Sequence, residues 1–228
     1  MITILDPDLN NQAFPPIERA LTEPDGLLAA GGCLSSQRLM NAYYHGIFPW
    51  YNEDDPILWW SPDPRLVLFP DKIHISKSLK KALRQQPFTI RFNTDFAAVI
   101  HACSQPRDYE KNTWLNEEMQ QAYIQLHQQG HAHSIEAWHQ GNLVGGLYGV
   151  TIGKIFFGES MFHTQTNASK AAFITLAQQL KEWRYEVIDC QIHSNHLVSL
   201  GAEEISRQQF SRLLNRYRQS SPRRDAWT

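Results

Sequence analysis

The sequence contains few cysteines, and their spacing excludes two common uses of this residue. Only Cys33, Cys103 and Cys190 are present in 228 residues, and no Cys-x-x-Cys pair occurs. An odd, widely spaced set argues against a disulfide framework and against a zinc site. The ten histidines likewise lack the paired spacing of zinc ligands. We therefore expect a cytoplasmic protein without a bound metal.

Long apolar runs and a strong excess of one charge are also absent. No run approaches the length that spans a membrane, and residues 1–7 lack the basic and apolar regions of a signal peptide, so we expect no membrane partner. The formal net charge is −2, so contact with a nucleic acid must come from a local basic patch. Phosphate-loop, dinucleotide and Gly-x-Ser-x-Gly motifs are missing too.

The composition changes near residue 62, which predicts two domains. Residues 1–62 are rich in proline, glycine and aromatic side chains, and they contain one helical stretch at residues 35–44. Residues 59–65 include two prolines that hold the preceding residues extended, as expected of a rigid crossing between units. We predict a small N-terminal α/β domain, residues 1–62, and a larger domain, residues 63–228.

The larger domain combines the periods of strands and of helices. A strand at residues 66–69 and a helix at residues 77–84 are followed by a helix that Asn116 caps. Three strand-like runs, 134–139, 143–150 and 154–162, are separated by turns. A long helix capped by Asn167, a strand at 187–192 and a last helix with a capping box of Ser206 and Gln209 complete the chain. This order predicts an α+β fold with a mixed sheet, and it is similar to the N-acyltransferase fold of the GNAT superfamily.

Three acidic or amide side chains are the candidates for chemistry. Asp189 and Gln191 lie two residues apart on a predicted strand and so share a face, where a carboxylate and an amide can hold an incoming amine and take its proton. Alternatively, they cap backbone groups at the end of the strand. Glu159 interrupts the aromatic run 156–162, where burial is costly without a partner such as a cationic substrate. Alternatively, it faces water on an edge strand.

Aromatic and basic clusters indicate possible contacts with a nucleic acid. The aromatic side chains of residues 46–51 and 59–60 suit the stacking of a base, or the seam between two domains. One face of the helix predicted at residues 77–84 carries four basic side chains, which suit phosphate binding or simply solubility. These are Lys77, Lys80, Lys81 and Arg84.

The segment after the third strand-like run argues against acetyl-CoA as a ligand. GNAT acetyltransferases cradle the pyrophosphate of this cofactor in a glycine-rich loop, but residues 163–170 contain no glycine. The backbone therefore lacks the freedom for close approach to a phosphate. A small-molecule N-acyltransferase with an acyl-CoA donor and a non-catalytic RNA-binding module remain the two alternative functions.

Several sequence blocks together resemble one known family, the bacterial leucyl/phenylalanyl-tRNA–protein transferases. They occur in the same order along almost the whole chain and include Gly46-Ile-Phe-Pro-Trp50, Gly158-Glu-Ser-Met-Phe162 and Ile188-Asp-Cys-Gln191. The chain departs from the family at Cys33, where an acidic residue is usual, and at Leu147, where methionine is common. Leucine and methionine are close in volume, so an apolar pocket is preserved.

The resemblance implies a monomer without metal or organic cofactor that transfers leucine or phenylalanine, with methionine as a further donor. The donor is the aminoacyl-tRNA, and the acceptor is a protein with N-terminal Arg or Lys, which the transfer marks for N-end-rule degradation. Asp189 and Gln191 orient the attacking amine, Glu159 lies nearby, and Trp50 and Trp114 contact the terminal adenosine. The basic face of residues 77–84 meets the tRNA phosphates. The implied side-chain pocket consists of Leu147, Phe156, Met161, Leu176 and Ile188.

Overall fold

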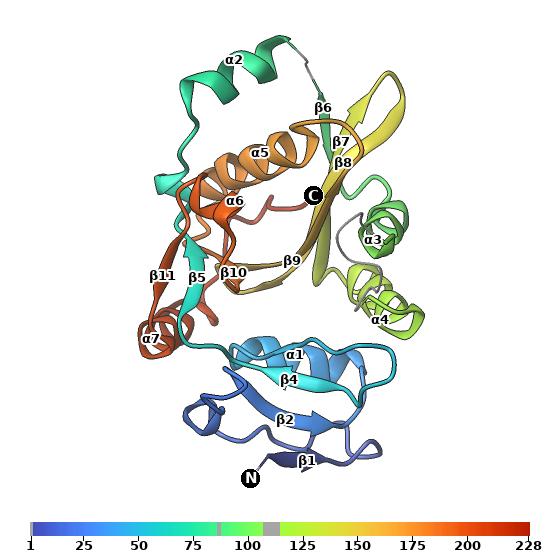
Figure 1. Ribbon diagram of the computed structural model, residues 1–228, viewed down its shortest axis with the longest axis vertical. Coiled ribbons are helices and arrows are strands. Elements are labelled where there is room, and N and C mark those ends of the chain that lie inside the picture. The colour runs from blue at the N-terminus through green and yellow to red at the C-terminus, as the bar shows by residue number, and fades with distance from the viewer. Residues whose placement is uncertain (1, 86–87, 107–114) are drawn as a thin grey trace.

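The structure is a computed structural model that describes residues 2–85, 88–106 and 115–228. Trp114, which the resemblance places at the adenosine, lies outside the described residues. Two β-sheets with flanking helices form the molecule, and the smaller sheet contains the N-terminus (Figure 1). No helix among the described residues is long and apolar enough to cross a membrane.

The smaller sheet has four short strands in the order β1-β2-β4-β3. They are β1 (Thr3–Leu5), β2 (Leu27–Gly31), β3 (Phe48–Pro49) and β4 (Leu58–Trp60). Helix α1 (Ser36–Tyr44) begins at Ser35, whose hydroxyl accepts a hydrogen bond from the Arg38 N–H, so the helix predicted at residues 35–44 is confirmed. The strands were not predicted, because they are too short to show an alternating pattern.

The larger sheet has seven strands in the order β11-β5-β10-β9-β8-β7-β6. Strands β9 and β10 are parallel, and the other neighbouring pairs are antiparallel. The predicted α+β fold with a mixed sheet is therefore confirmed. In chain order the strands are β5 (Arg65–Leu68), β6 (Thr89–Phe92), β7 (Ala132–His139), β8 (Asn142–Ile152), β9 (Ile155–His163), β10 (Val187–Gln191) and β11 (Glu203–Ile205).

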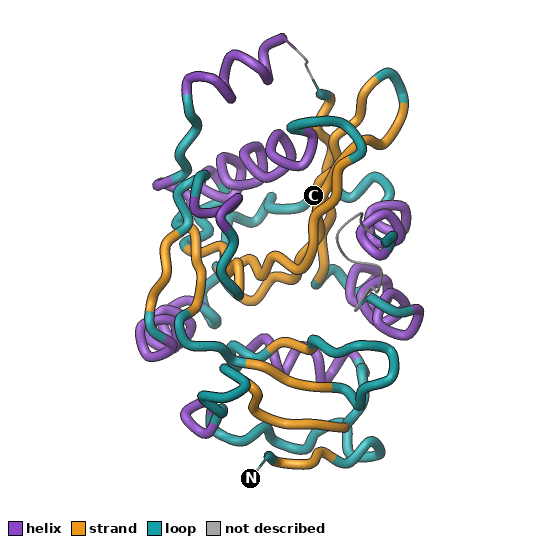
Figure 2. The backbone as a smooth tube through the Cα atoms, viewed as in Figure 1, coloured by secondary structure: helices purple, strands orange, loops and turns teal. Residues whose placement is uncertain are grey.

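Helices cover both faces of this sheet, which runs through the middle of the molecule (Figure 2). Helix α5 (Ala168–Glu182) packs on one face, and α3 (Phe96–Ser104) and α4 (Glu117–Gln128) pack on the other (Figure 1). Helix α2 (Lys77–Gln85) lies at the end of the molecule opposite the smaller sheet (Figure 1). The remaining helices are α6 (Asn195–Val198), α7 (Arg207–Tyr217) and two short 3₁₀ turns, Ile17–Arg19 and Pro70–Lys72.

One hydrophobic core joins the two sheets. Tyr43 and Ile47 from the smaller unit are fully buried in the same cluster as Phe157 and Phe210 of the larger unit. The ring of Tyr43 lies edge-on to Phe157, with ring centroids 5.2 Å apart. A second cluster lies beneath α5 and consists of apolar side chains from that helix and from the sheet. The predicted boundary at residue 62 falls between the last strand of one sheet and the first of the other, but the packing across it is continuous.

One predicted helix start differs from the structure. Asn167 occupies the position before α5, but its side chain makes no capping hydrogen bond and its φ is 69°. Asparagine adopts this left-handed conformation more readily than most residues, so it serves here as a turn residue. The predicted capping box of Ser206 and Gln209 at the start of α7 is confirmed.

Candidate active site

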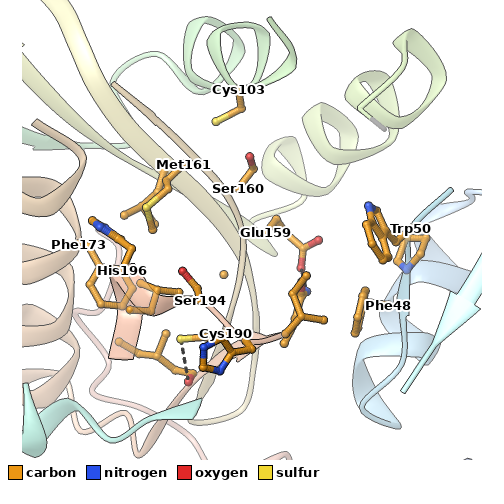
Figure 3. A pocket seen from close by; sticks show the side chains of 18 of the residues that line it. Phe48, Trp50, Cys103, Glu159, Ser160, Met161, Phe173, Cys190, Ser194 and His196 are labelled. Carbon is orange, nitrogen blue, oxygen red and sulfur yellow. Dashed lines mark hydrogen bonds between the residues drawn. The ribbon is translucent and has the colours of Figure 1, made fainter. Parts of the chain in front are cut away.

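A pocket of about 370 Å³ opens between the two sheets. Strand β3 of the smaller sheet forms one wall, and β9, β10 and the segment after β10 form the other. Figure 3 shows Phe48 and Trp50 on one side of Glu159, with Met161, Phe173 and His196 on the other side. The pocket therefore requires both parts of the chain.

The inner part of the pocket is apolar. Leu147, Met161 and Ile188, which the sequence analysis assigned to a side-chain pocket, line it together with Phe173 of α5 and Leu197 of α6. Leu147 and Met161 are partners across the β8–β9 pair, which places the two side chains next to each other. This surface suits an unbranched or aromatic side chain of moderate size.

Two other residues predicted to line this pocket lie elsewhere. Phe156 and Leu176 are both fully buried in the cluster beneath α5, and neither reaches the pocket surface. Phe156 alternates along β9 with the residues that face the opposite side of the sheet, and its ring stacks near Trp227. These two side chains pack behind the pocket wall.

Glu159 is the carboxylate in the pocket wall, and neutral donors hold it. The Gln191 Nε2 atom donates to Glu159 Oε1 at 2.9 Å, and the Tyr123 hydroxyl donates to Oε2 at 2.8 Å. The Tyr123 hydroxyl is in turn in hydrogen-bond contact with that of Tyr43. Burial raises the pKa of Glu159 to about 7; the negative charge of Asp189 adds to the rise, and the two tyrosine hydroxyls oppose it. The carboxyl group therefore titrates at a higher pH than an exposed glutamate.

Asp189 lies beside this network but not at the pocket surface. It is fully buried, and its two oxygens accept hydrogen bonds from Arg65 Nε at 2.8 Å and Arg65 Nη2 at 2.6 Å. The Arg65 guanidinium is held between the rings of Phe48 and Phe210. Asp189 Oδ1 also accepts the backbone N–H of Gln191 at 3.0 Å. A carboxylate engaged in this way is placed to fix its neighbours rather than to contact a substrate.

Strand β10 is irregular between Asp189 and Gln191. The register against β5 shifts at this point, and Gln191 has a φ of 66°. As a result, the consecutive residues Cys190 and Gln191 both line the pocket, which a regular strand would not allow. The expectation that Asp189 and Gln191 share a face on a regular strand is therefore wrong, because the bulge redirects the amide into the pocket.

Trp50 is at the outer part of the pocket. It is 40% exposed, and its ring lies at a tilt against that of Trp60, with centroids 5.8 Å apart. The Trp60 Nε1 atom donates to the Trp50 carbonyl at 2.6 Å, which ties the two strands together at this point. An exposed indole fixed at the mouth of a pocket is suited to stacking on a planar group.

The basic side chains of α2 form a separate surface. Lys77, Lys80, Lys81 and Arg84 line a shallow hollow on this helix, so the basic face predicted from the sequence is present. Leu79 and Leu83 of the same helix pack against the cluster beneath α5. The helix thus presents its charged face outward while its apolar face holds it to the larger unit.

The sequence analysis missed several side chains that build the site. Arg65, Tyr43 and Tyr123 come from three distant segments, and only the fold brings them to Asp189 and Glu159. Phe173 lies in the long helix predicted after Asn167, but the sequence analysis gave it no role in the site. An arginine directly after a Pro-Asp-Pro crossing is the one signal that could have drawn attention to Arg65. Among residues 2–85, 88–106 and 115–228, no group of three or more His, Cys, Asp or Glu side chains could hold a metal ion.

Comparison with known families matches most of the chain. Residues 67–215 match the family described as leucyl/phenylalanyl-tRNA protein transferase, and residues 32–63 match the N-terminal domain of the same family. The chain is 57% identical to the leucyl/phenylalanyl-tRNA–protein transferase of Pseudomonas fluorescens over 218 residues, which cover 96% of each chain. It is 56% identical to that of Methylococcus capsulatus over 227 residues, which cover 100% of this chain and 97% of the relative.

The solved structures found by comparison are more distant. A GCN5-related N-acetyltransferase from Kribbella flavida is 11% identical, with a TM-score of 0.40 over 72% of this chain and 58% of that one. A structure described as L-PGS from Bacillus licheniformis is 14% identical, with a TM-score of 0.42 over 65% and 49% of the two chains.

The sequence matches, together with the pocket and its carboxylate, define an aminoacyltransferase that uses an aminoacyl-tRNA and a protein as its two substrates. The chain belongs to the leucyl/phenylalanyl-tRNA–protein transferase family.

Proposed function

We propose that this enzyme transfers leucine or phenylalanine, and also methionine, from aminoacyl-tRNA to the α-amine of proteins with N-terminal Arg or Lys. The transfer marks those proteins for N-end-rule degradation in the cytoplasm, and the enzyme acts as a monomer. One observation carries the proposal: an apolar pocket of about 370 Å³ has Glu159 and Gln191 in its wall. The pocket accepts the side chain of the donor, and the polar pair faces the reacting groups.

The reaction is the aminolysis of an ester. The acceptor α-amine attacks the aminoacyl carbonyl, the new C–N bond forms the peptide, and the ribose oxygen leaves with a proton. An α-amine has a pKa of about 7.7–8.0, so about a tenth or more is neutral near pH 7. The ester is already activated. Alignment of the two reactants therefore contributes most, about 7–11 kcal/mol, and a general base adds about 10²–10⁴-fold.

Glu159 accepts the proton of the attacking amine in this proposal. Its carboxylate is in the pocket wall, and its pKa of about 7 matches the operating pH of a general base. The negative charge of Glu159 also attracts the cationic acceptor. The same carboxyl group can return the proton to the ribose oxygen as that oxygen leaves.

Asp189 acts through Gln191. The ion pair with Arg65 fixes the carboxylate of Asp189, which in turn holds the Gln191 backbone N–H. This contact stabilises the left-handed conformation that points the Gln191 amide at Glu159 and into the pocket. We therefore assign Gln191 to orientation of the amine and Asp189 to the positioning of Gln191.

The tRNA contacts two surfaces in this proposal. The exposed indole of Trp50 stacks on the terminal adenosine at the mouth of the pocket. The basic face of α2 binds phosphates of the acceptor stem, where Lys77, Lys80, Lys81 and Arg84 supply positive charge to a molecule of nearly neutral net charge.

The test uses labelled leucyl-tRNA with two peptides that differ only in the first residue, Arg or Ala. We expect label on the Arg peptide and none on the Ala peptide, and the same result with phenylalanyl-tRNA. Equal labelling of both peptides would remove the proposed acceptor specificity. If neither is labelled while acetyl-CoA acylates them, the enzyme would belong to the alternative class with an acyl-CoA donor.

A further inference from the structure

Cys33 lies at an accessible point between the two units of the molecule. It precedes α1 and lines an open groove with Ser35 of the same segment and with Gln121 and Gln125 of α4. The side chain is only partly buried, whereas Cys103 and Cys190 are both buried. Small solutes can therefore reach the Cys33 sulfur before they reach the other two thiols.

The guanidinium of Arg38 lies next to this thiol and is incompletely paired. Arg38 is fully buried. Its Nη2 atom donates to the carbonyls of Asp6 and Leu9, but its Nε and Nη1 atoms have no hydrogen-bond partner among the described residues. A buried charge with unsatisfied donors is costly, because those N–H groups have lost water and gained nothing in exchange. An anion with oxygen acceptors could pair with these two N–H groups.

The groups around the Cys33 thiol favour its anionic form on balance. The thiol donates to Asn10 Oδ1 at 3.0 Å, a contact that favours the protonated form, and to Ser35 Oγ at 3.6 Å. Partial burial raises the pKa of Cys33, but hydrogen bonds with the backbone and hydroxyl of Ser35 outweigh this effect and lower it, together with the Arg38 guanidinium, which acts as a donor to the thiolate and as a nearby positive charge. The thiolate is the form of cysteine that reacts with peroxides.

We propose that Cys33 is a site of reversible and then stable oxidation by peroxides, and that its oxygenated forms pair with the buried guanidinium of Arg38. In the first step, thiolate and hydrogen peroxide give sulfenate and water. In the second step, sulfenate and a second hydrogen peroxide give sulfinate and water. Sulfur is oxidised and peroxide oxygen is reduced each time.

The sulfinate has the geometry and charge to pair with the Arg38 guanidinium. Its two oxygens carry a negative charge and can accept hydrogen bonds from the Nε–H and Nη1–H of Arg38, as a carboxylate does in a fork-like pair. Arg38 also binds the carbonyls of Asp6 and Leu9. Oxidation therefore ties the N-terminal segment to α1 and stabilises the fold, in contrast to the damage that oxidation causes in most proteins.

The experiment treats the full chain with a small excess of hydrogen peroxide and measures two quantities. Mass spectrometry of the peptide that contains Cys33 should show the mass of two added oxygen atoms before Cys103 or Cys190 is modified. The melting temperature should rise by a few degrees. The near-isosteric variant Cys33→Ser receives the same treatment and should show no rise, which separates the effect from oxidation of methionine.

A second variant supplies the anion without oxidation. Cys33→Asp should melt above the reduced wild-type protein and should not respond to peroxide. The proposal is overturned if oxidised wild-type protein melts at or below the reduced form, or if oxygen is added elsewhere while Cys33 stays reduced. It is also overturned if Cys33→Asp melts below Cys33→Ser.

Discussion

At the scale of single residues, the site contains two carboxylates in different surroundings. Asp189 is matched with a buried guanidinium, which compensates its charge. Glu159 is held by an amide and a phenol, which carry no charge. Neighbouring acidic groups with such different partners can have different roles: Asp189 is an ion-paired part of the structure, and Glu159 exchanges a proton.

The first prediction concerns Glu159→Gln. Because burial raises the pKa of Glu159 to about 7, the carboxylate that accepts a proton forms only as the pH rises through that value. Transfer by the wild-type enzyme should therefore increase with pH near 7, in addition to the increase from titration of the acceptor amine. In Glu159→Gln the inflection near 7 should be lost and the rate should fall by about 10²–10⁴-fold.

The effect of the same variant on stability should depend on pH. A carboxyl group whose pKa is raised on folding costs stability above the pKa of the unfolded chain, and this cost grows until the pH passes the folded value. Glu159→Gln should therefore have a higher melting temperature than the wild-type protein at about pH 8, and its melting temperature should exceed that of the wild-type protein only slightly at about pH 5. A matched change at the exposed Glu18 of the first 3₁₀ turn should alter neither profile, and an unchanged inflection in Glu159→Gln would exclude Glu159 as the base.

The second prediction concerns the buried ion pair. Asp189→Ala leaves the Arg65 guanidinium buried without its partner, so unfolding by urea should show a loss of about 3–5 kcal/mol. The double variant Arg65→Met with Asp189→Leu should recover most of that loss, since both charges are gone. If Asp189 positions Gln191, the double variant should be stable but slow in transfer. Wild-type transfer rates in the double variant would contradict the role of Asp189.

At the scale of secondary-structure elements, short sequence patterns predicted the features that depend on neighbouring residues, such as helix caps. The caps at Asn116 and Ser206 were predicted from the sequence and lie at helix starts in the structure. The bulge at Gln191 was not predicted, because it depends on the pairing with β5 and on the ion pair of Asp189 with Arg65, which lies 124 positions away in the sequence. Pairing between distant segments leaves no periodic trace in one sequence.

The third prediction concerns α2, whose basic face is exposed. Lys80→Ala combined with Lys81→Ala should weaken binding of tRNA and reduce the slope of log affinity against log salt by about 0.7–0.9 for each lost phosphate contact. The helix itself should remain folded, since alanine favours helices and the apolar face is unchanged. Lys181→Ala, at the end of α5, is the matched control. An equal slope in the double variant and the control would exclude α2 from phosphate binding.

At the scale of the whole molecule, the two sheets depend on each other. Tyr43, Ile47 and Phe48 of the smaller unit are buried against side chains of the larger one. The pocket wall also combines Phe48 and Trp50 with residues of β9 and β10. The composition change at residue 62 indicated two domains, but it could not show that they share a core, because burial across an interface looks the same in sequence as burial within a domain.

The fourth prediction follows from this shared core. The full chain should unfold in one cooperative transition, with coincident changes in far-ultraviolet circular dichroism and tryptophan fluorescence. A fragment of residues 63–228 should be unfolded or aggregated, because it exposes the apolar side chains that the smaller unit covers. Two separate transitions in the full chain, or a folded and soluble fragment, would show that the units are independent.

The bulge in β10 also places an apolar contact and a polar contact for the substrate next to each other in the pocket. Cys190 and Gln191 are consecutive, yet one lines the pocket with a thiol buried against apolar neighbours and the other with an amide. An α-amino acyl group bears its side chain on the carbon next to the reacting carbonyl, so the enzyme must bind the side chain and the carbonyl side by side. In a β-amino acyl group one more methylene separates these two features. Such groups should therefore be poor donors even when their side chains fit the pocket.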